Sequence, residues 1–171
     1  MKELADAIRS IPDFPEPGIV FRDITTILQN PISLALAIES IADKLDGLDF
    51  DLIIGPESRG FIFGVPIAYK LKKGFIPVRK KGKLPYTTVS KGYALEYGSA
   101  EIEMHVDAIE KGQRVVVVDD LLATGGTCKA LAEMVEEVGG NIVAMVFLIE
   151  LEALKGRALL EGHDIHSIIK Y

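Results

Sequence analysis

The chain has 171 residues, of which 49% are hydrophobic and 26% charged, and a formal net charge of −6 at pH 7. This length predicts one domain spanning residues 1–171, which buries roughly 70% of the surface of its unfolded chain. The composition excludes a disordered chain, and the negative charge argues against nucleic-acid binding. Cys128 is the only cysteine, so no internal disulfide forms. No apolar run approaches the roughly 20 residues that span a bilayer. We therefore expect a cytoplasmic protein without membrane contact.

The first 50 residues combine helical patterns with a proline-rich interruption. Apolar residues at helical spacing predict a short helix over residues 2–10. The segment IPDFPEPGIVFRDIT (11–25) is too rich in proline for regular structure. It nevertheless carries several large apolar side chains, so it is either a surface loop or a lid over a ligand. Asn30 and Pro31 then suit the cap and first position of a helix, which Gly47 ends.

The remaining two thirds alternate strand and helix patterns. Helices are expected over residues 61–73 and from the glycines near 126 to Gly139, and a loop is expected over residues 81–92. The expected strands cover residues 51–55, 75–80, 93–98, 101–106, 114–120, 141–151 and 166–171. Such alternation is typical of the α/β class, with a mostly parallel sheet flanked by helices.

The run VVVVDDLLATGGT (115–127) carries the strongest functional signal. A buried strand would deliver Asp119 and Asp120 to the carboxyl edge of the sheet, where open α/β sheets bind ligands. Two carboxylates there suit the hydroxyls of a sugar or a divalent cation. The following ATGGT turn would wrap an anion with backbone N–H groups at a helix start. Together these features predict a ribose-phosphate site.

Two common nucleotide-binding motifs are absent. Gly125-Gly126-Thr127-Cys128-Lys129 does not supply the G-x-x-x-x-G-K-[ST] pattern of a P-loop. No G-x-G-x-x-G run follows an early strand, which argues against a dinucleotide fold. The anion loop is therefore of another kind.

With these residues in view, the chain resembles the type I phosphoribosyltransferases over about residues 3–171. VVVVDDLLATGGT is similar to the phosphoribosyl-diphosphate signature of that family, and FPEPGIVFRDIT and LEYGSAEIE resemble its adenine-specific branch. GPESRGFIFG, IPVRKKGKLP and LIELEALKGR also lie where that family has similar segments. The resemblance implies the type I phosphoribosyltransferase fold, with a small N-terminal hood from about residues 1–35 that binds the base.

The resemblance also implies roles for individual residues. Asp119 and Asp120 would bind the ribose 2′- and 3′-hydroxyls and offset positive charge that develops on the ribose ring. The pyrophosphate loop would include a non-proline cis peptide bond between Glu57 and Ser58, and Arg59 would assist departure of the diphosphate, although a plain surface arginine is the alternative. The 5′-phosphate loop would comprise Ala123, Thr124, Gly125, Gly126 and Thr127.

Charged residues in the middle of the chain have competing interpretations. Arg79, Lys80, Lys81 and Lys83 form a basic cluster, which is either a solvated face or a diphosphate-binding site. By resemblance, Arg79 and Lys80 would reach across a homodimer interface, and Lys83 would serve the same anion. Residues 97–105 resemble the family's mobile loop over the reacting centre. Glu103 would be its acid/base, managing the proton lost from N9 of the base. The alternative is that Glu103 simply lies on the outward face of a strand.

The implied activity is transfer of the 5-phosphoribosyl group from phosphoribosyl diphosphate to adenine, which yields AMP and diphosphate and belongs to purine salvage. Phe21 would stack near the purine, and main-chain atoms of Val20 and Arg22 would read its edge. Mg²⁺ would arrive with the diphosphate, so no metal site built from protein groups alone is expected. Two alternatives remain: the same reaction on xanthine or guanine, and a regulator that binds phosphoribosyl diphosphate without catalysis.

Overall fold

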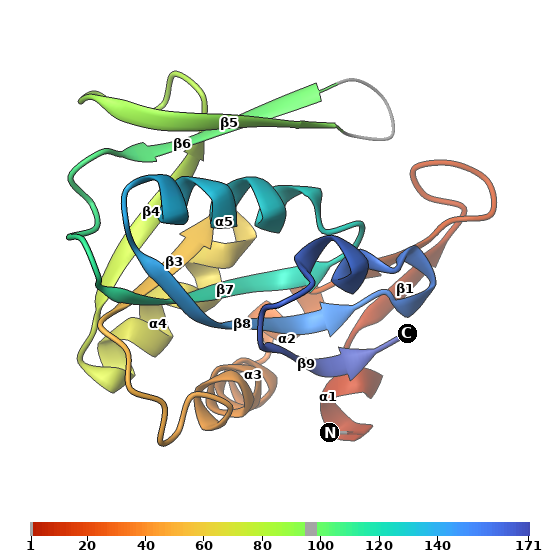
Figure 1. Ribbon diagram of the computed structural model, residues 1–171. Helices are drawn as coiled ribbons and strands as arrows, with labels where there is room; N and C mark the ends of the chain where they lie inside the picture. Colours follow the sequence, from red (N-terminus) through yellow and green to blue (C-terminus); the bar gives the residue numbers. More distant parts are fainter. Residues whose placement is uncertain (1, 95–98) are drawn as a thin grey trace.

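A computed structural model describes residues 2–94 and 99–171 (Figure 1). In this part of the chain a seven-stranded sheet runs in the order β5-β6-β4-β3-β7-β8-β9, and a separate hairpin pairs β1 with β2. The elements are α1 (Lys2–Asp6), β1 (Arg9–Pro12), β2 (Val20–Asp23), α2 (Thr25–Gln29), α3 (Pro31–Asp43), β3 (Leu52–Pro56), α4 (Arg59–Leu71), β4 (Gly74–Lys80), β5 (Thr88–Ala94), β6 (Ser99–His105), β7 (Arg114–Leu122), α5 (Gly126–Glu137), β8 (Asn141–Glu150), the 3-10 helices η1 (Glu152–Leu154) and η2 (Gly156–Leu160), and β9 (Ile165–Lys170).

The sheet is mostly parallel, which confirms the fold class expected from the sequence. Strands β4, β3, β7, β8 and β9 run parallel to one another, whereas β6 pairs antiparallel with β4 and β5 pairs antiparallel with β6. Parallel strands need crossover connections, and the helices that supply them cover both faces.

Strand β7 is buried on both faces because its valines alternate between two apolar clusters. Val116 and Val118 pack in the cluster that contains α3 and the buried side of α4. Val115 and Val117 pack in the cluster that contains α5. Figure 1 shows α5 on one side of the sheet and α3 and α4 on the other. This double burial explains the continuous apolar run, and it fixes β7 at the centre of the molecule.

The proline-rich N-terminal segment departs from the sequence expectation. The helix ends at Asp6, and Arg9–Pro12 forms a strand that pairs antiparallel with Val20–Asp23. Pro12 ends β1, whereas Pro15 and Pro17 lie in the connection between the strands, where they disturb no ladder, and the Phe14–Pro15 peptide bond is cis. The segment is therefore a hairpin rather than an irregular loop.

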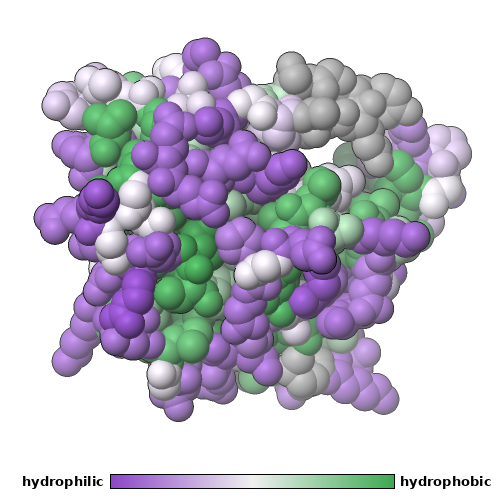
Figure 2. Space-filling model, in the orientation of Figure 1, coloured by the Kyte–Doolittle hydropathy of each residue, from purple (hydrophilic) through white to green (hydrophobic). Residues whose placement is uncertain are grey.

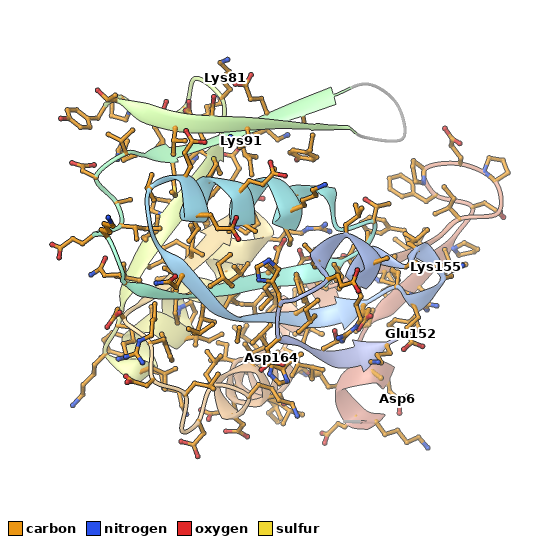
Figure 3. The ribbon with its side chains drawn as sticks, viewed as in Figure 1. Asp6, Lys81, Lys91, Glu152, Lys155 and Asp164 are labelled. Carbon is orange, nitrogen blue, oxygen red and sulfur yellow. The ribbon has the colours of Figure 1, made fainter. Side chains whose placement is uncertain are left out.

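The expected loop over residues 81–92 is also wrong in its second half, which forms β5. Only Val89 among its first residues is well buried, so the strand lacks an apolar pattern that would reveal it. Polar contacts hold it instead: the Lys91 ammonium (labelled in Figure 3) lies 2.6 Å from the Glu137 carboxylate on α5, and the Ser90 hydroxyl donates to the Glu101 carboxylate on β6 at 2.7 Å. The expected strand over 93–98 falls partly outside the described residues.

Other local expectations are confirmed. The Asn30 side chain accepts hydrogen bonds from the amides of Ile32 and Ser33, which caps α3, and Pro31 opens that helix. Helix α4 begins at Arg59, earlier than expected, and contains Pro66. The face seen in Figure 2 carries hydrophilic side chains over most of its area, with hydrophobic residues between them. None of the helices in residues 2–94 and 99–171 is long and apolar enough to cross a membrane.

Candidate active site

Asp119 and Asp120 lie where β7 passes the end of its neighbour. The pairing of β7 with β3 stops at Val117, whereas its pairing with β8 continues to Leu122. The strand is therefore longer than expected, and the two carboxylates lie within it at the carboxyl edge of the sheet. They line a cavity of about 220 Å³ together with Pro56, Glu57, Arg59, Lys80, Tyr93, Ile102, Leu121, Ala123 and Thr127.

The diacid is electrostatically strained in the free protein. Asp120 is only 3% exposed, and its Oδ2 lies 3.0 Å from Nε of Arg59. Burial raises the pKa of Asp119 well above its ordinary value, and the neighbouring Asp120 carboxylate raises it further. Burial also raises the pKa of Asp120, against the lowering effect of Arg59. A ligand with positive charge near Asp119 would relieve this penalty.

The ATGGT turn forms a compact loop directly after the diacid. Residues 121–128 and Asp119 line a cavity of about 70 Å³. Gly125 has φ +85°, a left-handed conformation that favours glycine, and α5 begins at the next residue. The first N–H groups of a helix have no partner within it and attract anions. The loop thus offers backbone donors within one short turn of two carboxylates.

The segment after β3 carries the expected cis peptide bond, between Glu57 and Ser58. The Glu57 amide donates to the Val78 carbonyl oxygen at 2.8 Å, and the Arg79 Nε donates to the Glu57 carboxylate at 2.5 Å. Burial raises the pKa of Glu57, but the hydrogen bond from Arg79 helps to hold that pKa below its ordinary value. Arg79 is thus paired within its own chain, and Lys80 lines the cavity beside the diacid.

The structure does not bring Glu103 together with the diacid. Glu103 is 4% exposed on β6, and Ile102 takes the place that faces the cavity. The Glu103 carboxylate accepts the backbone N–H groups of Lys83 and Leu84, each at 2.9 Å. Successive strand residues point to opposite faces, so Glu103 lies on the face of β6 opposite Ile102, covered by the loop that precedes β5. Residues 97 and 98 of the expected mobile loop lie outside the described residues.

The N-terminal hairpin closes a second, apolar cavity of about 460 Å³. Its lining comprises Ile11, Phe14, Phe21, Asp23, Ile24, Thr25, Leu28, Arg59 and Ile62. Phe14 packs edge-on against Phe21, with ring centroids 5.3 Å apart. Arg59 lines this cavity as well as the one with the diacid, so it links the two. Val20 and Arg22 flank Phe21 on β2 but do not line the cavity.

Two cavity residues had no signal in the sequence. Tyr93 and Ile102 line the diacid cavity from β5 and β6. The sequence predicts strands around both residues, but it does not show that β6 and β5 extend the sheet beside β4 and so bring these two side chains to the diacid. Among the described residues, no group of three or more His, Cys, Asp or Glu side chains is arranged to hold a metal ion.

Comparison with known proteins explains this combination of sheet-edge diacid, anion loop and hairpin. Residues 23–167 match the family model described as the phosphoribosyl transferase domain. The chain therefore belongs to the phosphoribosyltransferase family, and the resemblance expected from the sequence is confirmed.

Individual relatives identify the branch of the family to which the chain belongs. Adenine phosphoribosyltransferase of Lachnoclostridium phytofermentans is 62% identical over 171 residues, which are 100% of this chain and 98% of that protein. The crystal structure of adenine phosphoribosyltransferase from Thermoanaerobacter pseudethanolicus is 54% identical with a TM-score of 0.96, covering 99% of each chain. The Saccharomyces cerevisiae adenine phosphoribosyltransferase, complexed with an imino-altritol bisphosphate and adenine, is 38% identical with a TM-score of 0.92, covering 98% of this chain and 97% of that one. Within the family, the chain belongs to the adenine phosphoribosyltransferases.

Proposed function

We propose that this chain transfers the 5-phosphoribosyl group of phosphoribosyl diphosphate to N9 of adenine, which yields AMP and diphosphate in purine salvage. The observation that carries the proposal is the diacid of half-buried Asp119 and buried Asp120, followed within one turn by the amide-rich loop at the start of α5. Relatives named adenine phosphoribosyltransferase over the full length of the chain support the choice of base. They do not favour another purine or a non-catalytic regulator.

The diacid binds the ribose. Asp119 and Asp120 accept hydrogen bonds from its 2′- and 3′-hydroxyls, and they favour positive charge on the ring as its bond to diphosphate breaks. This preference follows from the raised pKa of Asp119, since a buried carboxylate pair is stabilised by any cation that develops beside it. Arg59 forms its ion pair with the Asp120 side of the diacid.

The two ends of the ribose are held by different loops. Backbone N–H groups of residues 123–127 bind the 5′-phosphate, and the Thr124 and Thr127 hydroxyls contribute further donors. Glu57, Ser58 and Arg59 form the loop that receives diphosphate, with Lys80 beside them in the same cavity. Arg79 orients Glu57. Lys83, from the same basic segment of the sequence, is assigned to the same anion.

The hairpin of β1 and β2 binds the purine base. Phe21 presents an aromatic face for the purine, and main-chain atoms of Val20 and Arg22 read its polar edge. Support comes from the apolar cavity under this hairpin and from Arg59, which links that cavity with the diacid. Residues 1–35 thus act as a hood within a single domain.

Mg²⁺ enters with the diphosphate. The two carboxylates at the cavity fit this assignment, because Mg²⁺ in phosphate-transfer sites is commonly held by one or two carboxylates and the substrate's own oxygens. When bound, Mg²⁺ offsets the charge of the departing diphosphate.

A homodimer is supported by an exposed apolar stripe on α4. Ile62, Val65 and Tyr69 share one helical face and are 36%, 49% and 87% exposed, and Ile32 on α3 is 70% exposed. Apolar residues at such spacing on a surface are typical of a protein interface. Tyr69→Asp is expected to yield monomers in analytical ultracentrifugation, and an unchanged sedimentation coefficient would contradict this interface. A cytoplasmic location is consistent with the buried, free Cys128.

The test is incubation of the purified protein with phosphoribosyl diphosphate and Mg²⁺ and one base per tube: adenine, guanine, hypoxanthine or xanthine. Chromatography is expected to detect AMP from adenine and little product from the others. Product from another base alone would overturn the specificity. Absence of product from all four bases, with phosphoribosyl diphosphate still bound, would favour the regulator.

A further inference from the structure

The short helix η2 interlocks with the 5′-phosphate loop through the backbone of Gly156. A Cβ atom on Gly156 would lie 2.2 Å from the Ala123 carbonyl oxygen. A Cβ atom on Gly125 would lie 2.5 Å from the Gly156 carbonyl oxygen. The two backbones are therefore in direct contact without intervening side chains. Any displacement of Gly156 displaces the loop or opens a gap behind it.

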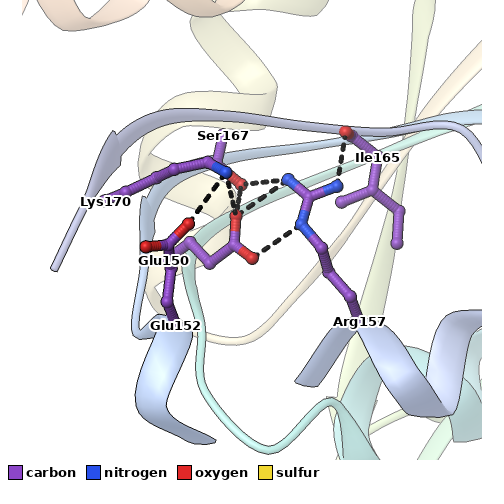
Figure 4. A network of polar contacts seen from close by, with 6 residues as sticks. All are labelled: Glu150, Glu152, Arg157, Ile165, Ser167 and Lys170. Atoms are coloured by element: carbon purple, nitrogen blue, oxygen red, sulfur yellow. Dashed lines mark hydrogen bonds and ion pairs between the residues drawn. The ribbon is translucent and has the colours of Figure 1, made fainter. Parts of the chain in front are cut away.

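Arg157, the next residue, ties η2 to the ends of two strands (Figure 4). Its guanidinium donates to both Glu150 carboxylate oxygens, at 2.6 and 2.8 Å, in a bidentate pair. It also donates to the Ile165 carbonyl oxygen at 2.9 Å and to the Ser167 hydroxyl at 3.1 Å. Glu150 ends β8, and the other two partners lie on β9. Four hydrogen bonds thus fix the residue that follows Gly156.

The carboxylate that receives Arg157 is itself held in place. Glu150 is 4% exposed and accepts a further hydrogen bond from the Ser167 hydroxyl at 2.6 Å. On the other side of β8, the Leu151 amide donates to the Leu122 carbonyl oxygen at 2.9 Å, immediately before the phosphate loop. A planar fork on a buried carboxylate defines position and direction more strictly than a single hydrogen bond does.

We propose that the Glu150–Arg157 pair is a positioning device for the 5′-phosphate loop, which acts through Gly156 and sets the geometry of residues 123–127. This inference rests on the proposed function, because it takes that loop as the phosphate site. Arg157 touches the loop only through its chain neighbour, so it is a positioning residue. Without the pair, η2 shifts, Gly156 withdraws from Ala123 and Gly125, and the backbone donors lose their alignment for a phosphate.

The test compares AMP with adenosine, which differ only in the 5′-phosphate. Affinities are measured by isothermal titration calorimetry for the wild type, Arg157→Ala and Arg157→Lys. Arg157→Ala is expected to weaken the binding of AMP about tenfold and to leave the affinity for adenosine unchanged. Misplaced binding groups lose affinity only for the part of the ligand that they hold. Arg157→Lys retains a cation but not the fork, and an intermediate loss is expected.

Lys170→Ala is the matched control. Lys170 belongs to the same polar cluster, 3.0 Å from Glu152 and 4.0 Å from Glu150, but it lies on β9 and its ion pairs are with η1 and β8 rather than with η2 (Figure 4). It is expected to leave the AMP-to-adenosine affinity ratio at the wild-type value. A loss of the same size in Lys170→Ala and Arg157→Ala would overturn the proposal.

A purely structural role would give a different result. The proposal is overturned if folded Arg157→Ala binds AMP as the wild type does, or loses affinity equally for AMP and adenosine. If Arg157→Ala does not fold, the AMP-to-adenosine affinity ratios of Arg157→Lys and Arg157→Gln test the proposal instead. Failure of the proposed function is recognised separately, since the wild type itself would then show no preference for AMP over adenosine.

Discussion

Replacement of Glu103 discriminates between two functions of one buried carboxylate. The structure indicates that Glu103 anchors the loop before β5, since it accepts the Lys83 and Leu84 amides at 2.9 Å and the Thr88 hydroxyl at 3.4 Å. Removing the acceptor of a buried donor costs about 1–3 kcal/mol, because that donor is then left without a partner. Glu103→Ala should therefore lower the free energy of unfolding by at least about 1–3 kcal/mol.

The decisive variant is Glu103→Gln, which retains an acceptor oxygen but cannot exchange a proton with the base. An anchor predicts a kcat near that of the wild type, whereas loss of an acid/base residue lowers kcat by roughly 10² to 10⁴. Urea denaturation and steady-state AMP formation measure the two quantities. Glu101→Gln is the control, because Glu101 lies two residues earlier on the same face of β6 and accepts from Lys81 and Ser90. A hundredfold fall in kcat for Glu103→Gln, with unchanged stability, would refute the anchor.

The diacid, the phosphate loop and the Glu150–Arg157 pair each give a further prediction. Replacement of both Asp119 and Asp120 by asparagine should abolish AMP formation and raise the free energy of unfolding at pH 7, because burial raises both carboxyl pKa values; wild-type turnover would contradict the ribose assignment. Gly125→Ala should cost about 2–5 kcal/mol in urea denaturation, combining about 1–2 for a left-handed residue with about 1–3 for the clash against Gly156. Glu150→Gln should destabilise the fold at pH 7 and progressively less in acid. The hydrogen bond from Arg157 lowers the folded-state pKa of Glu150, so its contribution is present above the ordinary carboxyl pKa and disappears as pH falls through the lowered value. Equal destabilisation by Glu150→Gln at pH 7 and at pH 3 would contradict this linkage.

The sequence reveals most where local patterns are unambiguous. Four consecutive valines are typical of a strand buried on both faces, and such a strand places the diacid that follows it at the sheet edge. The cap and proline at residues 30 and 31 likewise mark the start of α3 by local chemistry. Both features depend on neighbouring residues, which a sequence displays directly.

Features that depend on distant partners are not visible in the same way. Strand β5 carries few apolar residues, because its contacts are polar bonds to β6 and α5, so its composition resembles that of a loop. Glu103 has two competing interpretations because the sequence does not show which loop crosses the outer face of β6. Arg157 gains its importance only from the fold, which sets it against Glu150 and Ser167 on two different strands.

The carboxylates at the sheet edge are in an unfavourable environment in the free protein, and a positively charged transition state would stabilise them. Arg59 forms its ion pair with Asp120 rather than with Asp119, and burial of Asp119 makes its ionised form unfavourable. A donor such as phosphoribosyl diphosphate carries little positive charge on its ribose before the bond to diphosphate weakens. On the proposed ribose assignment, positive charge would develop beside Asp119 as that bond breaks and would offset the unfavourable ionisation of this carboxyl. Interactions that strengthen only at that stage lower the barrier without tightening the ground state. In the proposed reaction, the unfavourable environment of the diacid thus lowers the stability of the folded chain and also lowers the barrier to cleavage of the bond to diphosphate.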